Sequence, residues 1–63
     1  MCEFKVFLDG NQVAEDIIYA KQEEGKVIIQ DIIGTPKTFE DVEINEVNVF
    51  STRLVLRKRA SGG

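Results

Sequence analysis

The sequence contains no histidine, no tryptophan, one cysteine and one proline in 63 residues. Without histidine the chain cannot form a Ser-His-Asp triad or a Cys-His pair, so we do not expect an enzyme. A single cysteine cannot form an internal disulfide. No stretch approaches the roughly 20 apolar residues of a membrane span, and the chain lacks the pattern of a signal peptide. We therefore expect a cytoplasmic protein without a membrane partner.

The residues that are present are typical of a small folded domain. The chain is 43% hydrophobic and 30% charged, with a net charge of −3. We predict one β domain over residues 1–59 and a disordered tail over residues 60–63. A domain of this size buries only about 60% of the surface of its unfolded chain. Additional stabilisation is therefore expected from a partner chain or a metal.

Alternating apolar residues predict β-strands in the first half of the chain. Phe4, Val6 and Leu8 recur at every second position, which is the period of a half-buried strand. Asp9-Gly10 is a typical hairpin turn. Residues 15–22 are rich in β-formers and predict a second strand. Gly25 is expected in the next turn, because glycine readily adopts the left-handed conformation.

The second half of the chain continues the pattern. Residues 27–33 are the most hydrophobic segment and predict a central strand. The following strands are predicted over 37–39, over 42–49 with a β-bulge near Asn45-Glu46, and over 54–56. About six short strands without a helix favour an all-β fold: a small antiparallel barrel or sandwich of the SH3-like kind.

A basic group near the C-terminus is one candidate site. Arg53, Arg57, Lys58 and Arg59 fall within seven consecutive residues of an otherwise acidic chain. Such a group could contact the phosphates of RNA. The simpler interpretation is a solvated strand end that offsets the acidic residues. RNA binding is therefore kept as the alternative function.

Cys2 is the other candidate because its position beside the α-amine suits metal chelation. The Met1 amine, the deprotonated Cys2 amide and the Cys2 thiolate can bind one metal in two fused five-membered rings. This planar nitrogen and sulfur set suits Ni(II) or Cu(II) better than Zn(II), which prefers a tetrahedron. A second Cys2 across a symmetric dimer would complete the ligand set. The other interpretation is a small buried or terminal cysteine without a role.

The order and spacing of these segments resemble a known family, the small CooT-type nickel-binding proteins. The resemblance runs from Met1 to about Lys58. It rests on Met1-Cys2 followed directly by a strand, Asp9-Gly10, Glu15-Asp16-Ile17, Gly25-Lys26-Val27, Asp31-Ile32-Ile33-Gly34, Ile44-x-x-Val47-x-Val49 and Leu54-Val55-Leu56.

The resemblance implies a homodimer that binds nickel through Cys2. It also implies an accessory role, as a nickel chaperone for an enzyme such as carbon monoxide dehydrogenase. Many relatives are described as predicted RNA-binding proteins, which keeps the alternative open. Where small or apolar residues commonly follow the cysteine, this chain has Glu3.

Overall fold

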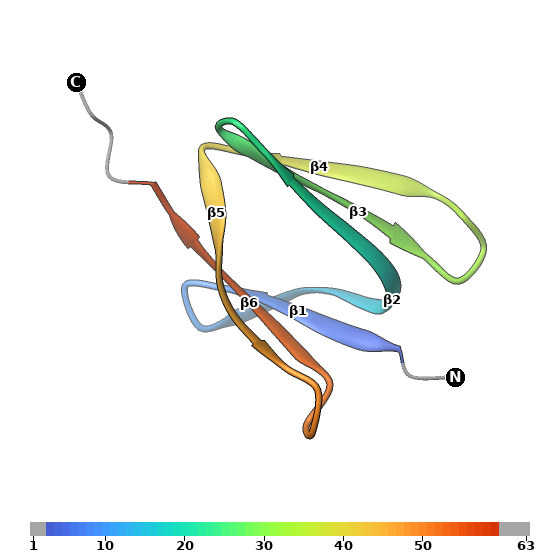
Figure 1. Ribbon diagram of the computed structural model, residues 1–63. Helices are drawn as coiled ribbons and strands as arrows, with labels where there is room; N and C mark the ends of the chain where they lie inside the picture. Colours follow the sequence, from blue (N-terminus) through green and yellow to red (C-terminus); the bar gives the residue numbers. More distant parts are fainter. Residues whose placement is uncertain (1–2, 60–63) are drawn as a thin grey trace.

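The computed structural model describes residues 3–59 and consists of six β-strands in one sheet (Figure 1). All adjacent pairs are antiparallel except β1 and β6, which run parallel. The order across the sheet is β4-β3-β2-β1-β6-β5. The strands are β1 (Phe4–Leu8), β2 (Asn11–Glu23), β3 (Lys26–Asp31), β4 (Pro36–Glu40), β5 (Val42–Asn48) and β6 (Arg53–Lys58).

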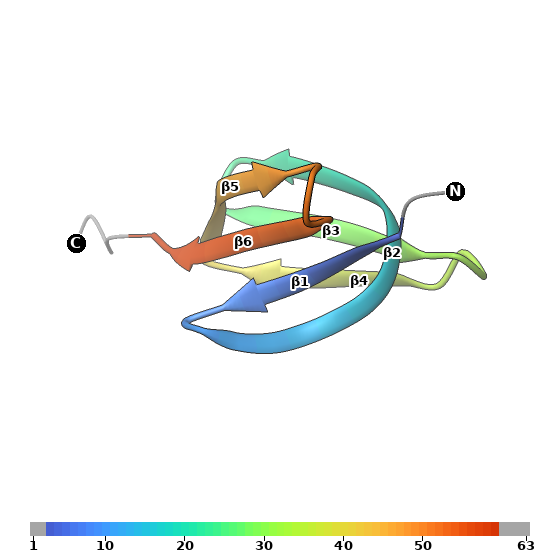
Figure 2. The same ribbon diagram turned by 90° about the horizontal axis from the view of Figure 1, so that it is seen from below.

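The long strand β2 changes partners halfway along its length. Its first half pairs with β1 as far as Ile17, and its second half pairs with β3 from Ile17 onward. Asp16, at the change, has a φ of 58°, and a register shift follows between Ile17 and Tyr19. Bulges of this kind bend a strand and increase its twist. Figures 1 and 2 show β2 curving from β1 to β3, which folds the sheet over on itself.

The core lies on the inner face of this folded sheet. Because strand side chains alternate between faces, every second residue of β3 and β6 points inward. Seven apolar side chains are buried: Val6, Ile17, Val27, Ile29, Val42, Leu54 and Leu56. Phe4, Leu8, Phe39 and Ile44 pack against them and remain partly exposed. Every strand thus contributes to one small apolar core.

The all-β prediction is confirmed, and two details of it are wrong. The sheet is mixed rather than antiparallel, because β1 and β6 run parallel. It is also not closed into a barrel, because β4 and β5 are its two edges. β1 lies between β2 and β6. The parallel pair was not predicted because a pattern of alternating residues does not reveal which strand lies beside another or in which direction it runs.

Local predictions are mostly confirmed. Asp9 and Gly10 have φ values of 54° and 81°, as a two-residue hairpin between Leu8 and Asn11 requires. A register shift lies between Ile44 and Glu46, where the bulge was expected. The prediction that residues 32–33 extend a central strand is wrong. β3 ends at Asp31, whose Oδ1 accepts hydrogen bonds from the backbone N–H groups of Ile33 and Thr35.

Candidate functional site

The predicted metal ligands Met1 and Cys2 lie outside the described residues. The structure describes the chain from Glu3, which is exposed, and β1 begins at Phe4. Cys2 directly precedes Glu3 in the sequence, so β1 is the described strand next to it along the chain. The surroundings of Phe4 are therefore the part of the structure that bears on Cys2.

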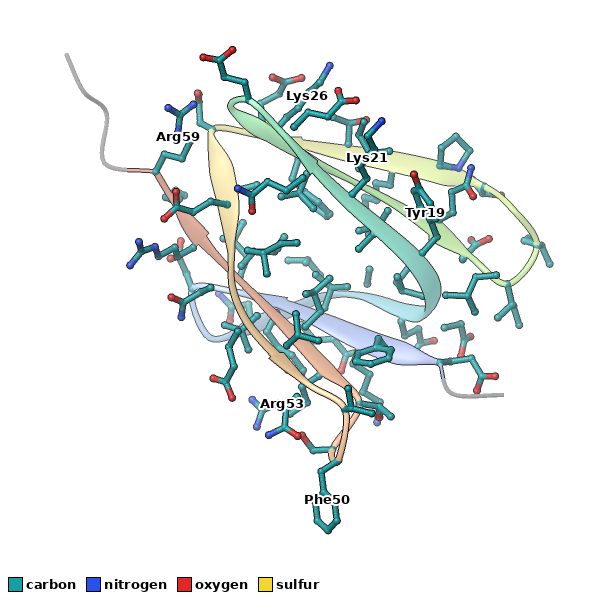
Figure 3. The ribbon with its side chains drawn as sticks, viewed as in Figure 1. Tyr19, Lys21, Lys26, Phe50, Arg53 and Arg59 are labelled. Atoms are coloured by element: carbon teal, nitrogen blue, oxygen red, sulfur yellow. The ribbon has the colours of Figure 1, made fainter. Side chains whose placement is uncertain are left out.

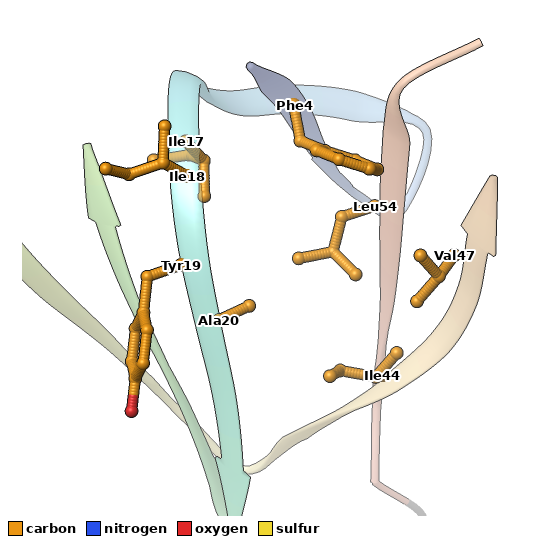
Figure 4. Close-up of a pocket in the computed structure, with 8 residues that line it drawn as sticks. All are labelled: Phe4, Ile17, Ile18, Tyr19, Ala20, Ile44, Val47 and Leu54. Carbon is orange, nitrogen blue, oxygen red and sulfur yellow. The ribbon is translucent and has the colours of Figure 1, made fainter. Parts of the chain in front are cut away.

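Phe4 lines an apolar groove between the second half of β2 and strand β5. The groove has a volume of about 240 Å³. Figure 4 shows the side chains that line it. The lining residues are Phe4 of β1, Ile17, Ile18, Tyr19 and Ala20 of β2, Ile44 and Val47 of β5, and Leu54 of β6.

Polar contacts join the two sides of the groove at one of its ends. The Ile44 N–H donates a hydrogen bond to Oε1 of Gln22 at 2.7 Å, which joins β5 to β2. Nearby, the Asp41 N–H donates to the Gly25 carbonyl at 2.7 Å, and the Arg59 N–H donates to the Asp41 carbonyl at 2.9 Å. β2 and β5 therefore converge at this end and diverge toward Phe4, as Figure 4 shows.

Three of the four basic residues of the alternative site each contact a different partner. The Arg57 Nε donates to the Glu43 carboxylate at 2.6 Å, and the Lys58 Nζ lies 3.8 Å from Asp9 Oδ2. The Arg53 guanidinium lies 4.6 Å from the ring centroid of Phe7, in a cation–π contact. Figure 3 shows Arg53 and Arg59 far apart. Arg57, Lys58 and Arg59 line one open pocket together with Glu43, and Arg53 is not part of it. RNA binding stays a prediction.

One surface ion pair shifts the titration of its members. The Lys21 Nζ lies 3.1 Å from the Glu23 carboxylate. This hydrogen bond is the main cause that lowers the pKa of Glu23 and raises the pKa of Lys21. Both side chains are well exposed, so the pair has only a small effect on stability.

Within residues 3–59, no group of three or more histidine, cysteine or acidic side chains could hold a metal ion. Over the same residues, no helix is long and apolar enough to cross a bilayer.

The fold and the groove place this chain among small all-β proteins, with an apolar groove beside the start of β1. Comparison with known families identifies the family within that class. The sequence model of the family described as "CO dehydrogenase accessory protein CooT" matches residues 1–57. The chain belongs to this family, which is one of accessory proteins rather than of catalysts. No curated protein matches the chain.

Sequence reasoning did not identify the groove. Ile18, Ile44 and Val47 come from strands distant in sequence, and nothing in their local pattern indicates that they meet. The exposed pair Ile32 and Ile33 was assigned to a strand. The signal for a turn was present, because Asp31 followed by Gly34 and Pro36 is typical of one.

Proposed function

We propose that this protein binds Ni(II) as cargo through the Cys2 thiolates of two copies and serves a nickel enzyme as an accessory protein. The observation that carries the proposal is the family match, because it spans residues 1–57 and therefore includes Cys2. Carbon monoxide dehydrogenase, which names the family, is a nickel enzyme. A carrier for such an enzyme needs ligands that bind nickel and can release it.

The donor atoms of the sequence support nickel as the cargo. The chain has no imidazole and no thiol besides Cys2. The only thiolate therefore comes from this residue, with nitrogen from the Met1 amine and the Cys2 amide. Such a set of nitrogen and sulfur ligands suits a metal ion that prefers square-planar coordination, such as Ni(II). One chain supplies a single thiolate, so a site with two thiolates requires two copies of the chain.

The experiment is a titration of the reduced protein with Ni(II), followed by the ultraviolet charge-transfer bands of nickel thiolate. Saturation at one nickel per two chains is expected. Cys2→Ser should remove the bands, because the hydroxyl is a much poorer ligand. Glu3→Gln is the matched control: it changes the neighbouring side chain, which the proposal does not use as a ligand, and should keep the stoichiometry.

Two results would contradict the proposal. One is stoichiometric nickel binding that survives Cys2→Ser. The other is a titration of the wild type that produces no thiolate bands at equimolar metal. Circular dichroism of Cys2→Ser should match that of the wild type, so that loss of binding is not mistaken for loss of fold.

A further inference from the structure

Positively charged side chains gather at the end of β6. Arg57, Lys58 and Arg59 line an open pocket of about 460 Å³ together with Glu43 of β5. We call these four residues the basic pocket. Three cations lie there beside one carboxylate, although the whole chain carries a net charge of −3. The basic pocket is therefore a local site of positive charge on an acidic protein.

Glu43 holds the Arg57 side chain in place and leaves some of its donors for another acceptor. The two residues are register partners across β5 and β6. Nε and Nη2 of Arg57 both contact Oε2 of Glu43. A guanidinium group has five N–H donors, so this pair leaves donors for a second acceptor. The Arg57 side chain is 63% exposed, so a partner can reach them.

Arg59 is positioned by the turn between β2 and β3. Its N–H donates to the Asp41 carbonyl at 2.9 Å, and the Asp41 N–H donates to the Gly25 carbonyl at 2.7 Å. A Cβ added at Gly25 would lie only 2.9 Å from Nη1 of Arg59, so the glycine leaves room for the guanidinium group. None of the ion pairs formed within residues 3–59 involves Arg59. Its guanidinium group is therefore held near the turn without a carboxylate partner from that part of the chain.

The residues of the basic pocket suit carboxylates better than an RNA strand. The guanidinium fork binds a carboxylate through two parallel hydrogen bonds. RNA recognition usually combines several phosphate contacts with bases stacked on aromatic rings. The basic pocket has no aromatic residue, and the nearby cation–π pair of Arg53 with Phe7 is not part of it. A short acidic segment of a protein therefore fits the pocket better than a long polyanion.

The basic pocket is remote from the start of β1. In the parallel pair of β1 and β6, Lys5 lies beside Arg53 and Leu8 lies beside Leu56. The residues after Leu56 therefore extend past the end of β1, whereas Cys2 precedes its start in the sequence. Figure 3 likewise shows Arg59 far from Arg53. A partner at the basic pocket would thus contact a part of the protein other than the proposed metal ligands.

We propose that the basic pocket docks an acidic segment of a partner protein, whose carboxylates bind the guanidinium groups of Arg57 and Arg59. These two residues are separated by one residue on an extended chain, so their side chains lie on the same face. Carboxylates at alternate positions of an extended segment have the same spacing. The inference goes beyond the proposed function, because it concerns a separate surface and does not require nickel.

The experiment is an NMR titration of the metal-free protein with an end-capped peptide of alternating Glu and Gly residues. We expect shifts of the Arg57 and Arg59 Nε–H signals that weaken as the salt concentration rises. Arg59→Gln removes one guanidinium group at an exposed position and should raise the Kd at least about threefold. Arg53→Gln is the matched control, because it makes the same change at the other end of β6 and should leave the Kd unchanged.

Three results would overturn the inference. One is the absence of shifts at Arg57 and Arg59 in a large excess of peptide. Another is an equal loss of affinity in Arg53→Gln and Arg59→Gln, which would indicate general attraction between charges. The third is tighter binding of an oligouridine of equal charge at the same signals, which would favour RNA as the partner. A peptide in which Gln replaces Glu should cause no shifts, and the dispersion of the amide signals should show that both variants are folded.

Discussion

Replacement of Ile29 by alanine tests the core on which the account of the fold depends. Ile29 lies on β3 and has no exposed surface, whereas the adjacent Ile28 is only half-buried, on the other face of the strand. Ile→Ala substitutions at fully buried sites cost about 2–5 kcal/mol, from lost apolar transfer and from the cavity left behind. A chain of this length has a total stability of about 3–9 kcal/mol. Ile29→Ala should therefore remove a large share of the free energy of unfolding.

The assay is urea unfolding of metal-free protein, with Ile28→Ala as the matched control. All variants are measured at one protein concentration, because association would otherwise contribute to the apparent stability. The difference between the two costs should be at least about 1 kcal/mol, because the two side chains differ in burial. Equal costs at Ile28 and Ile29 would refute the assignment of the inner and outer faces of β3.

Three further predictions concern single residues. Gln22→Ala should lower stability by about 0.5–1.5 kcal/mol and speed hydrogen exchange at the Ile44 amide, which loses its side-chain acceptor; unchanged exchange would contradict that bond. Gly10→Ala should cost about 1–2 kcal/mol through backbone strain alone, because φ is 81° and an added Cβ would meet no neighbour within 4 Å; an unchanged melting temperature would contradict the turn. The hydrogen bond with Lys21 is the main cause that lowers the pKa of Glu23 in the folded state. The contribution of Glu23 to folding stability is therefore present above its unfolded pKa and is lost as the pH falls through its folded pKa. Glu23→Gln should therefore destabilise the protein slightly at neutral pH and have no effect at low pH; an equal loss at both would contradict the ion pair.

The sequence was sufficient to predict the strands and most of the turns because each depends on neighbouring residues. Asp9-Gly10 and Gly25 adopt the positive φ values that their residue types favour. The pattern around Ile44 changes phase, and the sheet has a bulge there. These features require no information about distant parts of the chain.

The topology and the groove could not be predicted in the same way. The parallel contact of β1 with β6 joins residues almost 50 positions apart, such as Lys5 and Arg53. The groove depends on the bend of β2 at Asp16, where a non-glycine residue has a positive φ. Such a conformation in the middle of a strand is uncommon and has no signal in the alternation of apolar residues.

Part of the candidate site could be predicted from the sequence, and part of it could not. Cys2 follows from its residue type and its place in the chain, so sequence and resemblance were enough to select it. The groove follows only from the three-dimensional arrangement, because its lining residues come from β1, β2, β5 and β6. Local hydrophobicity placed Ile33 in a strand, although the hydrogen bonds of Asp31 hold it in an exposed turn.

The most direct test of the central claim is native mass spectrometry of the reduced protein after incubation with Ni(II). The account predicts a species of two chains with one nickel, present for the wild type and absent for Cys2→Ser. A single chain with one bound nickel, or a dimer that binds nickel equally without the Cys2 thiol, would contradict it.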